Sequence, residues 1–131
     1  MADILLVDDA EDIRESLSAV LRGDGHNVTE ASNGREAIAA LASRHFELVI
    51  TDIMMPEQDG TEVIMYLEGR EPRPPVLAIS GGAPNVPAYM ALHLARLKAD
   101  ATLMKPFRND DLRAKVSQLL STRQACHSLN R

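Results

Sequence analysis

The sequence predicts an α/β fold in which a doubly wound, five-stranded parallel sheet is covered on both faces by five helices. Short apolar runs alternate along the chain with segments whose apolar residues recur at helical spacing. Two of these runs, Ile4–Val7 and Leu48–Thr51, are apolar almost throughout, as in strands that are buried on both faces. The 131 residues contain no repeat and no dividing linker, so they are expected to form one domain.

The five expected strands are short and separated by helix-length intervals. They are Ile4–Val7, Val28–Ala31, Leu48–Thr51, Val76–Ile79 and Ala101–Met104. The second strand has the weaker apolar pattern, and Asn33-Gly34 after it predicts a turn.

The expected helices follow the strands in turn. Their apolar positions are Ile13, Leu17, Val20 and Leu21; Ala37, Ile38, Leu41 and Ala42; Val63, Ile64 and Leu67; a stretch from about Ala88 to Lys98; and Leu112, Val116, Leu119 and Leu120. Gly23 and Gly25 are expected to end the first helix. Asn109 or Asp110 is expected to cap the last helix, which is predicted to end near Ser121.

Composition excludes several classes of protein. With 14 basic and 19 acidic residues the net charge is −5, which argues against a free-standing nucleic-acid binder. No stretch approaches the ~18 apolar residues of a membrane helix, and the acidic N-terminus does not resemble a secretory signal. A single cysteine, Cys126, suits the cytoplasm. We expect residues 1–121 to form the domain and 122–131 a frayed polar tail, with no output domain.

Polar side chains follow four of the five expected strands. Asp8 and Asp9 follow the first strand, Asp52 the third, Ser80 the fourth and Lys105 the fifth. Open parallel sheets bind ligands beyond the carboxyl ends of their strands. In the strand order 2-1-3-4-5 these four strands are neighbours. Three carboxylates, a hydroxyl and an amine are therefore predicted at one edge of the sheet.

These residue types suit phosphoryl transfer. Neighbouring carboxylates repel one another, and a hard cation that keeps some water, such as Mg²⁺, relieves the repulsion. Lys105 suits a phosphoryl oxygen, and Ser80 can add a neutral hydrogen bond. Asp52 is the natural nucleophile beside the Asp8-Asp9 pair. Taken alone, adjacent acids are more often a solvated turn, and only the whole set favours the metal site.

The same residues carry a resemblance to a known family. The features are Asp8-Asp9 after a buried strand, Asp52 within Val49–Pro56 and Gly60 beyond it, Ser80-Gly81, and Lys105-Pro106-Phe107. Over residues 2–120 the chain resembles a stand-alone, CheY-like receiver domain of two-component response regulators. The strand order 2-1-3-4-5 is implied by this resemblance.

The resemblance implies a phosphorylation site. Asp52 is expected to take a phosphoryl group from the phosphohistidine of a sensor histidine kinase or a histidine phosphotransfer protein. Mg²⁺ is expected to bind Asp9, Asp52 and the backbone carbonyl of Met54, with Asp8 acting through water.

The resemblance also implies a switch, from which the sequence departs. Lys105 is expected to pair with the phosphoryl group and Ser80 to move toward it. Receivers usually have Tyr or Phe three residues before this lysine, and here that residue is Thr102. The segment 81–87 is also longer than usual. Both departures concern the output step and leave the phosphorylation chemistry intact.

The fourth expected helix is apolar on nearly all sides. Met90, Leu94 and Leu97 form a second apolar face opposite an alanine-rich one. Two interpretations stay open. These residues either pack beneath the long loop, or dock a downstream protein target or a second copy of the chain.

We therefore expect a signalling domain that is not an enzyme beyond slow autodephosphorylation, with protein partners and no nucleic-acid or membrane partner. A Mg²⁺-dependent phosphohydrolase with Asp52 as nucleophile is the alternative. That class places a second Asp two residues later, where Met54 stands, and carries a cap domain. A phosphorylation-independent interaction module on the same fold is a further alternative. A flavin or nucleotide site is disfavoured because Asp8 and Asp9 repel phosphate and no P-loop spacing occurs.

Overall fold

The structure, a computed structural model, describes residues 2–52, 60–67, 73–80, 99–104 and 107–129. For residues 60–62, 80 and 122–129 the description covers the backbone alone. None of the helices in this part of the chain has the length and apolarity of a membrane span.

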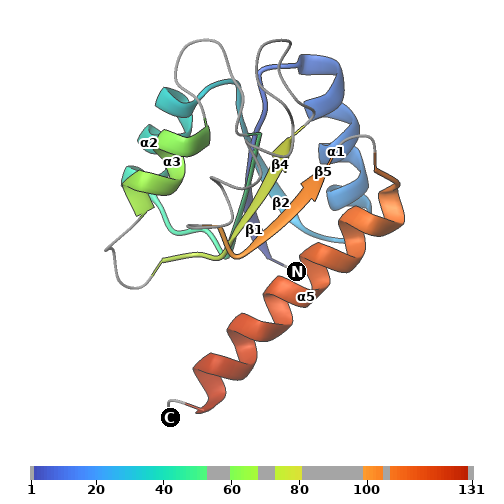
Figure 1. The fold of residues 1–131 in the computed structure, drawn as a ribbon, viewed down its shortest axis with the longest axis vertical. Coiled ribbons are helices and arrows are strands. Elements are labelled where there is room, and N and C mark those ends of the chain that lie inside the picture. Colours follow the sequence, from blue (N-terminus) through green and yellow to red (C-terminus); the bar gives the residue numbers. More distant parts are fainter. Residues whose placement is uncertain (1, 53–59, 68–72, 81–98, 105–106, 130–131) are drawn as a thin grey trace.

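The fold is built on a five-stranded parallel sheet with the order β2-β1-β3-β4-β5 (Figure 1). The strands are β1 (Asp3–Val7), β2 (Asn27–Ala31), β3 (Leu48–Asp52), β4 (Val76–Ser80) and β5 (Ala101–Met104). Every neighbouring pair is parallel. The predicted fold class and strand order are thereby confirmed, with strand ends within one residue of those predicted.

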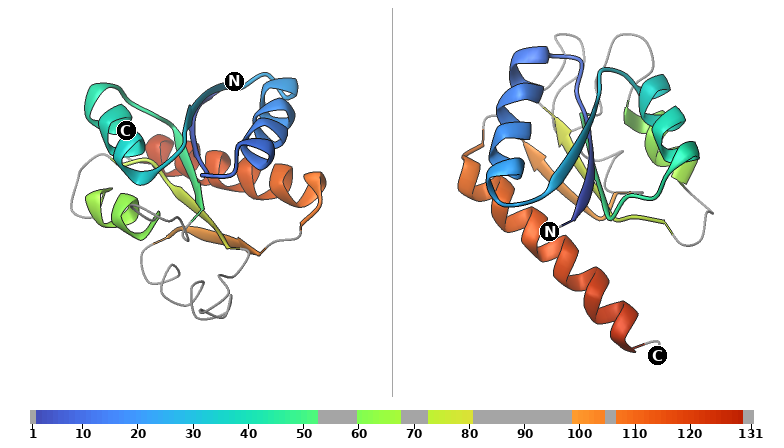
Figure 2. Two further views of the ribbon diagram at one scale, coloured as in Figure 1. Left: turned by 90° about the horizontal axis from the view of Figure 1, so that it is seen from above. Right: turned by 180° about the vertical axis from the view of Figure 1, so that it is seen from behind.

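Helices cover both faces of the sheet. They are α1 (Glu11–Gly23), α2 (Gly34–Ser43), α3 (Gly60–Leu67) and α5 (Asn109–Leu129). Figure 2 shows α1 and α5 on one face and α2 and α3 on the other. The helix expected from about Ala88 to Lys98, with Met90, Leu94 and Leu97, lies outside the described residues.

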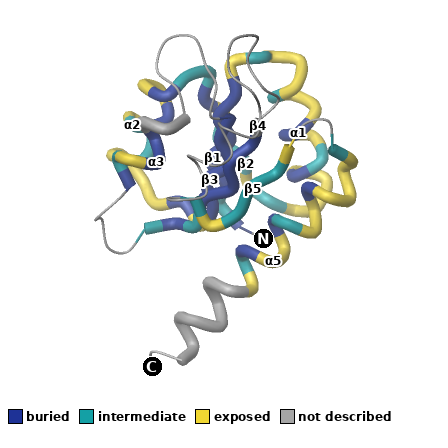
Figure 3. Tube along the Cα trace, viewed as in Figure 1, coloured by how far each residue is buried: buried dark blue, intermediate teal, exposed yellow. Residues whose placement is uncertain are grey.

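The core consists of two apolar layers, one on each face of the sheet. Ile4 and Leu6 of β1 pack in the layer beneath α1 and α5, whereas Leu5 and Val7 pack in the layer beneath α2 and α3. All four side chains are buried, as are all the residues of β3 (Figure 3). Burial on both faces explains why these strands are apolar runs rather than alternating patterns.

Helix α1 buries fewer residues than its pattern predicts. Leu17 and Leu21 are 5% and 0% exposed, but Ile13 is 38% exposed. Ile13 belongs to the first turn of α1, which begins beyond the carboxyl end of β1 (Figure 1). Ile13 continues the helical spacing of the apolar residues but does not join the buried core.

The ends of two other helices also differ from the predictions. Gly34 is the first residue of α2, and Asn33 caps that helix rather than forming a separate turn. Helix α5 begins at Asn109, and the main-chain N–H of Arg108 donates to the Asp111 carboxylate at 3.1 Å. The helix continues past Ser121 to Leu129, because no glycine or proline stops it.

Candidate functional site

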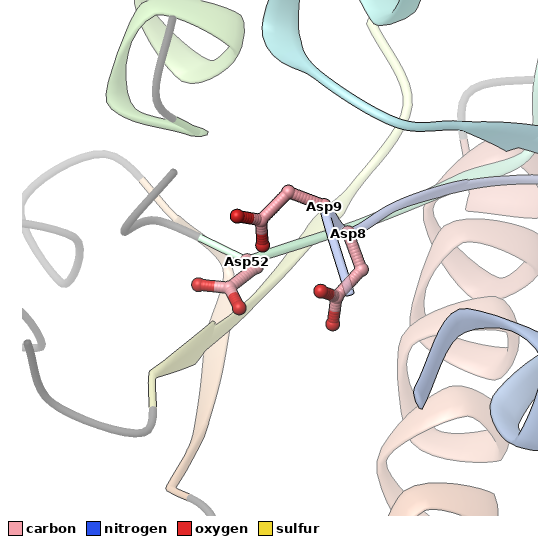
Figure 4. A group of neighbouring side chains, drawn as sticks. All are labelled: Asp8, Asp9 and Asp52. Carbon is pink, nitrogen blue, oxygen red and sulfur yellow. The ribbon is translucent and has the colours of Figure 1, made fainter. Parts of the chain in front are cut away.

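The sheet register brings Asp8, Asp9 and Asp52 together. Val7 of β1 pairs with Thr51 of β3, so Asp8 and Asp52 are the next residues along two adjacent parallel strands. Asp9 follows in the turn that leads to α1. Figure 4 shows the three carboxylates gathered at this edge of the sheet.

The three carboxylates are close enough to share one cation. One oxygen from each lies within 4.8 Å of the others. Asp8 and Asp52 are only 1% and 6% exposed, whereas Asp9 is exposed to solvent. The cluster therefore has two ligands set into the protein and one at its surface.

The donor set fits a hard divalent cation. Burying carboxylates side by side is costly unless opposite charge compensates them. The three side chains offer oxygen atoms alone, and Mg²⁺ prefers one or two carboxylates with water completing its shell. Because Asp9 lies at the surface, this water can remain. The predicted cluster of Asp8, Asp9 and Asp52 is thus brought together in a form that suits Mg²⁺.

Hydrogen bonds hold the turn that carries two of these acids. The main-chain N–H of Asp8 donates to the carbonyl of Ala31 at 3.1 Å, which ties the end of β1 to the end of β2. One carboxylate oxygen of Asp8 accepts the N–H of Ala10 at 2.9 Å. This side-chain-to-backbone bond is typical of an Asx turn. On β3, the hydroxyl of Thr51 donates to the carbonyl of Asp52 at 3.0 Å.

The other predicted site residues lie at the same edge or outside the described residues. Ser80 is the last residue of β4 and pairs with Met104 of β5, so its backbone lies at the carboxyl edge of the sheet. Thr102 lies on β5 opposite Ala78. Lys105 and Met54 lie outside the described residues.

An ion pair that the sequence does not predict lies beside the cluster. Arg14 of α1 donates from Nη1 to the carbonyl of Asp8 at 2.8 Å and from Nε to Glu30 of β2 at 3.0 Å. Arg14 and Glu30 are separated by 16 residues. No local sequence motif predicts a pair between residues so far apart in the chain.

Comparisons with known proteins agree on one family. The family of the response regulator receiver domain matches residues 4–117. The putative response regulator NtrX-like of Rickettsia bellii is 36% identical over 114 residues, which are 86% of this chain and 23% of that protein. The CpxR homologue of Haemophilus influenzae is 32% identical over 92% of this chain and 51% of its own length. The chain thus spans about half or less of the length of these relatives.

Solved structures show the same likeness. A CheY-like response regulator receiver domain protein from Methanospirillum hungatei has a TM-score of 0.84 at 27% identity, over 95% of this chain and 98% of that one. The response regulator TrrA from Thermotoga maritima, solved in complex with Mg²⁺ and BeF, has a TM-score of 0.79 at 32% identity. That match covers 91% of this chain and 99% of TrrA.

Proposed function

This chain belongs to the response regulator receiver domain family of two-component signalling, and from that premise we propose that Asp52 accepts a phosphoryl group in a Mg²⁺-dependent reaction. The observation that carries the proposal is the cluster in which Asp8, Asp9 and Asp52 bring three carboxylate oxygens within 4.8 Å of one another. The likeness to TrrA, solved with Mg²⁺ and BeF, supports the same assignment.

Asp52 acts as the nucleophile. One of its carboxylate oxygens attacks the phosphorus of a phosphohistidine carried by a sensor histidine kinase or a histidine phosphotransfer protein. The P–N bond breaks, its electron pair returns to the donor imidazole, and an acyl phosphate forms on Asp52. The position of Asp52 at the end of a fully buried strand keeps the carboxylate fixed for this attack.

Asp9, Asp52 and the backbone carbonyl of Met54 are the proposed Mg²⁺ ligands, with Asp8 acting through water. When bound, Mg²⁺ offsets the negative charge that the carboxylates and the phosphoryl oxygens bring together. Lys105 and Ser80 are the two further residues that we propose to contact the phosphoryl group. Lys105 pairs with a phosphoryl oxygen, and Ser80 donates a hydrogen bond to one.

We place the output in contacts with another protein or a second copy of the chain, with Met90, Leu94 and Leu97 as the proposed contact residues. We propose that the domain hydrolyses its own acyl phosphate slowly and catalyses no other reaction. The single cysteine supports a cytoplasmic location. Because Thr102 replaces the usual aromatic residue, the proposed switch operates without an aromatic rotamer change at this position.

The test is phosphorylation by a small donor. The chain is incubated with acetyl phosphate and Mg²⁺, and its intact mass is followed with and without EDTA. We expect one base-labile phosphoryl group in the wild type, none with EDTA and none in Asp52→Asn. Asp12→Asn, which removes an exposed acid of α1, is the control and should behave as the wild type.

Two results would overturn the proposal. Equal phosphorylation of Asp52→Asn would move the acceptor to another residue. Release of many phosphates per chain would instead favour the phosphohydrolase.

A further inference from the structure

The peptide group between Asp8 and Asp9 is held from α1. Its carbonyl oxygen, that of Asp8, accepts a hydrogen bond of 2.8 Å from Nη1 of Arg14. The preceding peptide group is held as well, since the N–H of Asp8 donates to Ala31 at 3.1 Å. Peptide groups are planar, so fixing these two groups fixes the direction in which the side chain of Asp8 leaves the backbone. The peptide group after Asp9 is held in turn, because the N–H of Ala10 donates to the Asp8 carboxylate at 2.9 Å.

Arg14 is itself held by a second element. Its Nε lies 3.0 Å from Oε1 of Glu30 on β2, and its side chain is 15% exposed. Glu30 also lies 3.6 Å from Arg22, which follows Arg14 by about two turns of α1. The planar guanidinium can bind a carboxylate with one nitrogen and a carbonyl with another, which the single ammonium of lysine cannot do in the same geometry.

We propose that Arg14 is a positioning residue for the Mg²⁺ site, acting through the main chain of Asp8. It joins Glu30 of β2 to the Asp8–Asp9 peptide group and so sets two of the three acids against Asp52. This inference rests on the proposed function, because that proposal supplies the Mg²⁺ site. Arg14 is neither one of the three acids nor one of the residues on which the family resemblance rests, so this role is a new assignment.

The direction in which Mg²⁺ affinity changes when Arg14 is replaced distinguishes a positioning role from a simple effect of its charge. Arg14 carries a positive charge close to the proposed cation site, so by Coulomb repulsion alone its removal should strengthen Mg²⁺ binding. Loss of positioning should weaken it instead. Residues that orient metal ligands typically contribute about 10- to 100-fold to metal affinity.

The experiment measures Mg²⁺ affinity by isothermal titration calorimetry for the full chain and four variants. We expect Arg14→Met and Arg14→Lys each to weaken Mg²⁺ binding by about tenfold or more. Arg14→Lys is decisive because lysine keeps the positive charge but lacks the second nitrogen with which the guanidinium binds both Glu30 and the carbonyl of Asp8. Glu30→Gln should weaken binding less, because Arg14 keeps its bond to Asp8.

Arg22→Met is the matched control. Arg22 lies on the same helix, contacts Glu30 at 3.6 Å and donates to the carbonyl of Val28 at 3.0 Å. Its loss removes a longer and more exposed ion pair to the same Glu30 and should leave Mg²⁺ affinity within about twofold of the wild type, since exposed pairs contribute little. Affinities of Arg14→Lys and Arg14→Met equal to or tighter than that of the wild type would overturn the proposal.

A second measurement needs no metal. In EDTA, amide hydrogen exchange of Ala10, whose N–H bonds to the Asp8 carboxylate, should accelerate in both Arg14 variants and not in Arg22→Met. Unchanged exchange at Ala10 would contradict the positioning role. If the wild type bound no Mg²⁺, the proposed metal site would fail, and the exchange result would still decide whether Arg14 orders the turn.

Discussion

Val7 and Thr51 are paired across β1 and β3, and the residue that follows each of them in the chain is an aspartate. The register of these two strands therefore determines which side chains meet at the site. A slip of one residue would turn every side chain of a strand to the opposite face of the sheet. Because the apolar residues of both strands are buried on both faces, the register and the acidic cluster are specified by the same packing.

The first prediction concerns metal and stability. Mg²⁺ at 100 times its dissociation constant should stabilise the wild type by about 2.7 kcal/mol, because the unfolded chain has no assembled site. Asp9→Asn should lose most of this increment and, without metal, should be more stable than the wild type because one repelling charge is gone. Thermal unfolding in EDTA and in Mg²⁺ measures both effects. Asp12→Asn is the control and should keep the full increment; an equal loss there would refute a specific site.

The second prediction concerns the cap of α2. The side chain of Asn33 accepts the N–H of Glu36 at 2.8 Å. Asn33→Ala removes this acceptor and should cost about 1 kcal/mol of unfolding free energy, as measured by urea denaturation. Asn33→Asp retains the acceptor and should stay close to the wild type. If the two variants lost the same stability, the hydrogen bond would not be the cause.

The third prediction concerns pH. The main-chain N–H and the hydroxyl of Ser32 each donate to one carboxylate oxygen of Glu36 at 2.7 Å. The main-chain bond first and the hydroxyl bond second hold the pKa of Glu36 below its ordinary value. Burial opposes this shift, and the charge of Arg14 supports it. A carboxyl whose pKa is lower in the folded chain stabilises the fold above its unfolded pKa. That stabilisation is lost as the pH falls through the folded pKa.

Glu36→Gln tests this dependence. The wild type should be more stable than this variant at neutral pH, and the difference should close as the medium is acidified through the folded pKa of Glu36. Ser32→Ala keeps the main-chain donor, so its own pH dependence should be smaller than that of the wild type but of the same sign. Unfolding midpoints across the acidic range provide the measurement, and a constant difference between wild type and Glu36→Gln would contradict it.

The fourth prediction concerns a buried hydroxyl in α1. Ser18 is 2% exposed, and its Oγ has no hydrogen-bond partner within the described part of the chain. Ser18→Ala should therefore raise the unfolding free energy by about 1 kcal/mol, combining the lost desolvation penalty with better helix propensity. Ser16→Ala, at an exposed position of the same helix, reports the propensity alone and should gain less. If Ser18→Ala and Ser16→Ala raised the unfolding free energy equally, the buried hydroxyl of Ser18 would not be the cause of the gain.

The fold and the acidic cluster could be predicted because both depend on local patterns. Buried strands such as Leu48–Asp52 are apolar runs, and the acids stand directly after them, where the topology of a parallel sheet brings strand ends together. The exposure of Ile13 could not be predicted, because helical spacing does not say how far a helix extends beyond the sheet. The Arg14–Glu30 pair depends on how α1 lies against β2, which periodicity leaves unspecified.

The uneven packing of the sheet has a consequence for how a chemical change at Asp52 can spread. The residues of β3 are all buried, whereas those of β5 are partly buried or exposed. A close-packed interior resists displacement, so the central strands act as a rigid support for the acids. Rearrangement requires less disruption at the periphery, and a conformational signal is therefore expected to leave the domain through the edge that β5 forms.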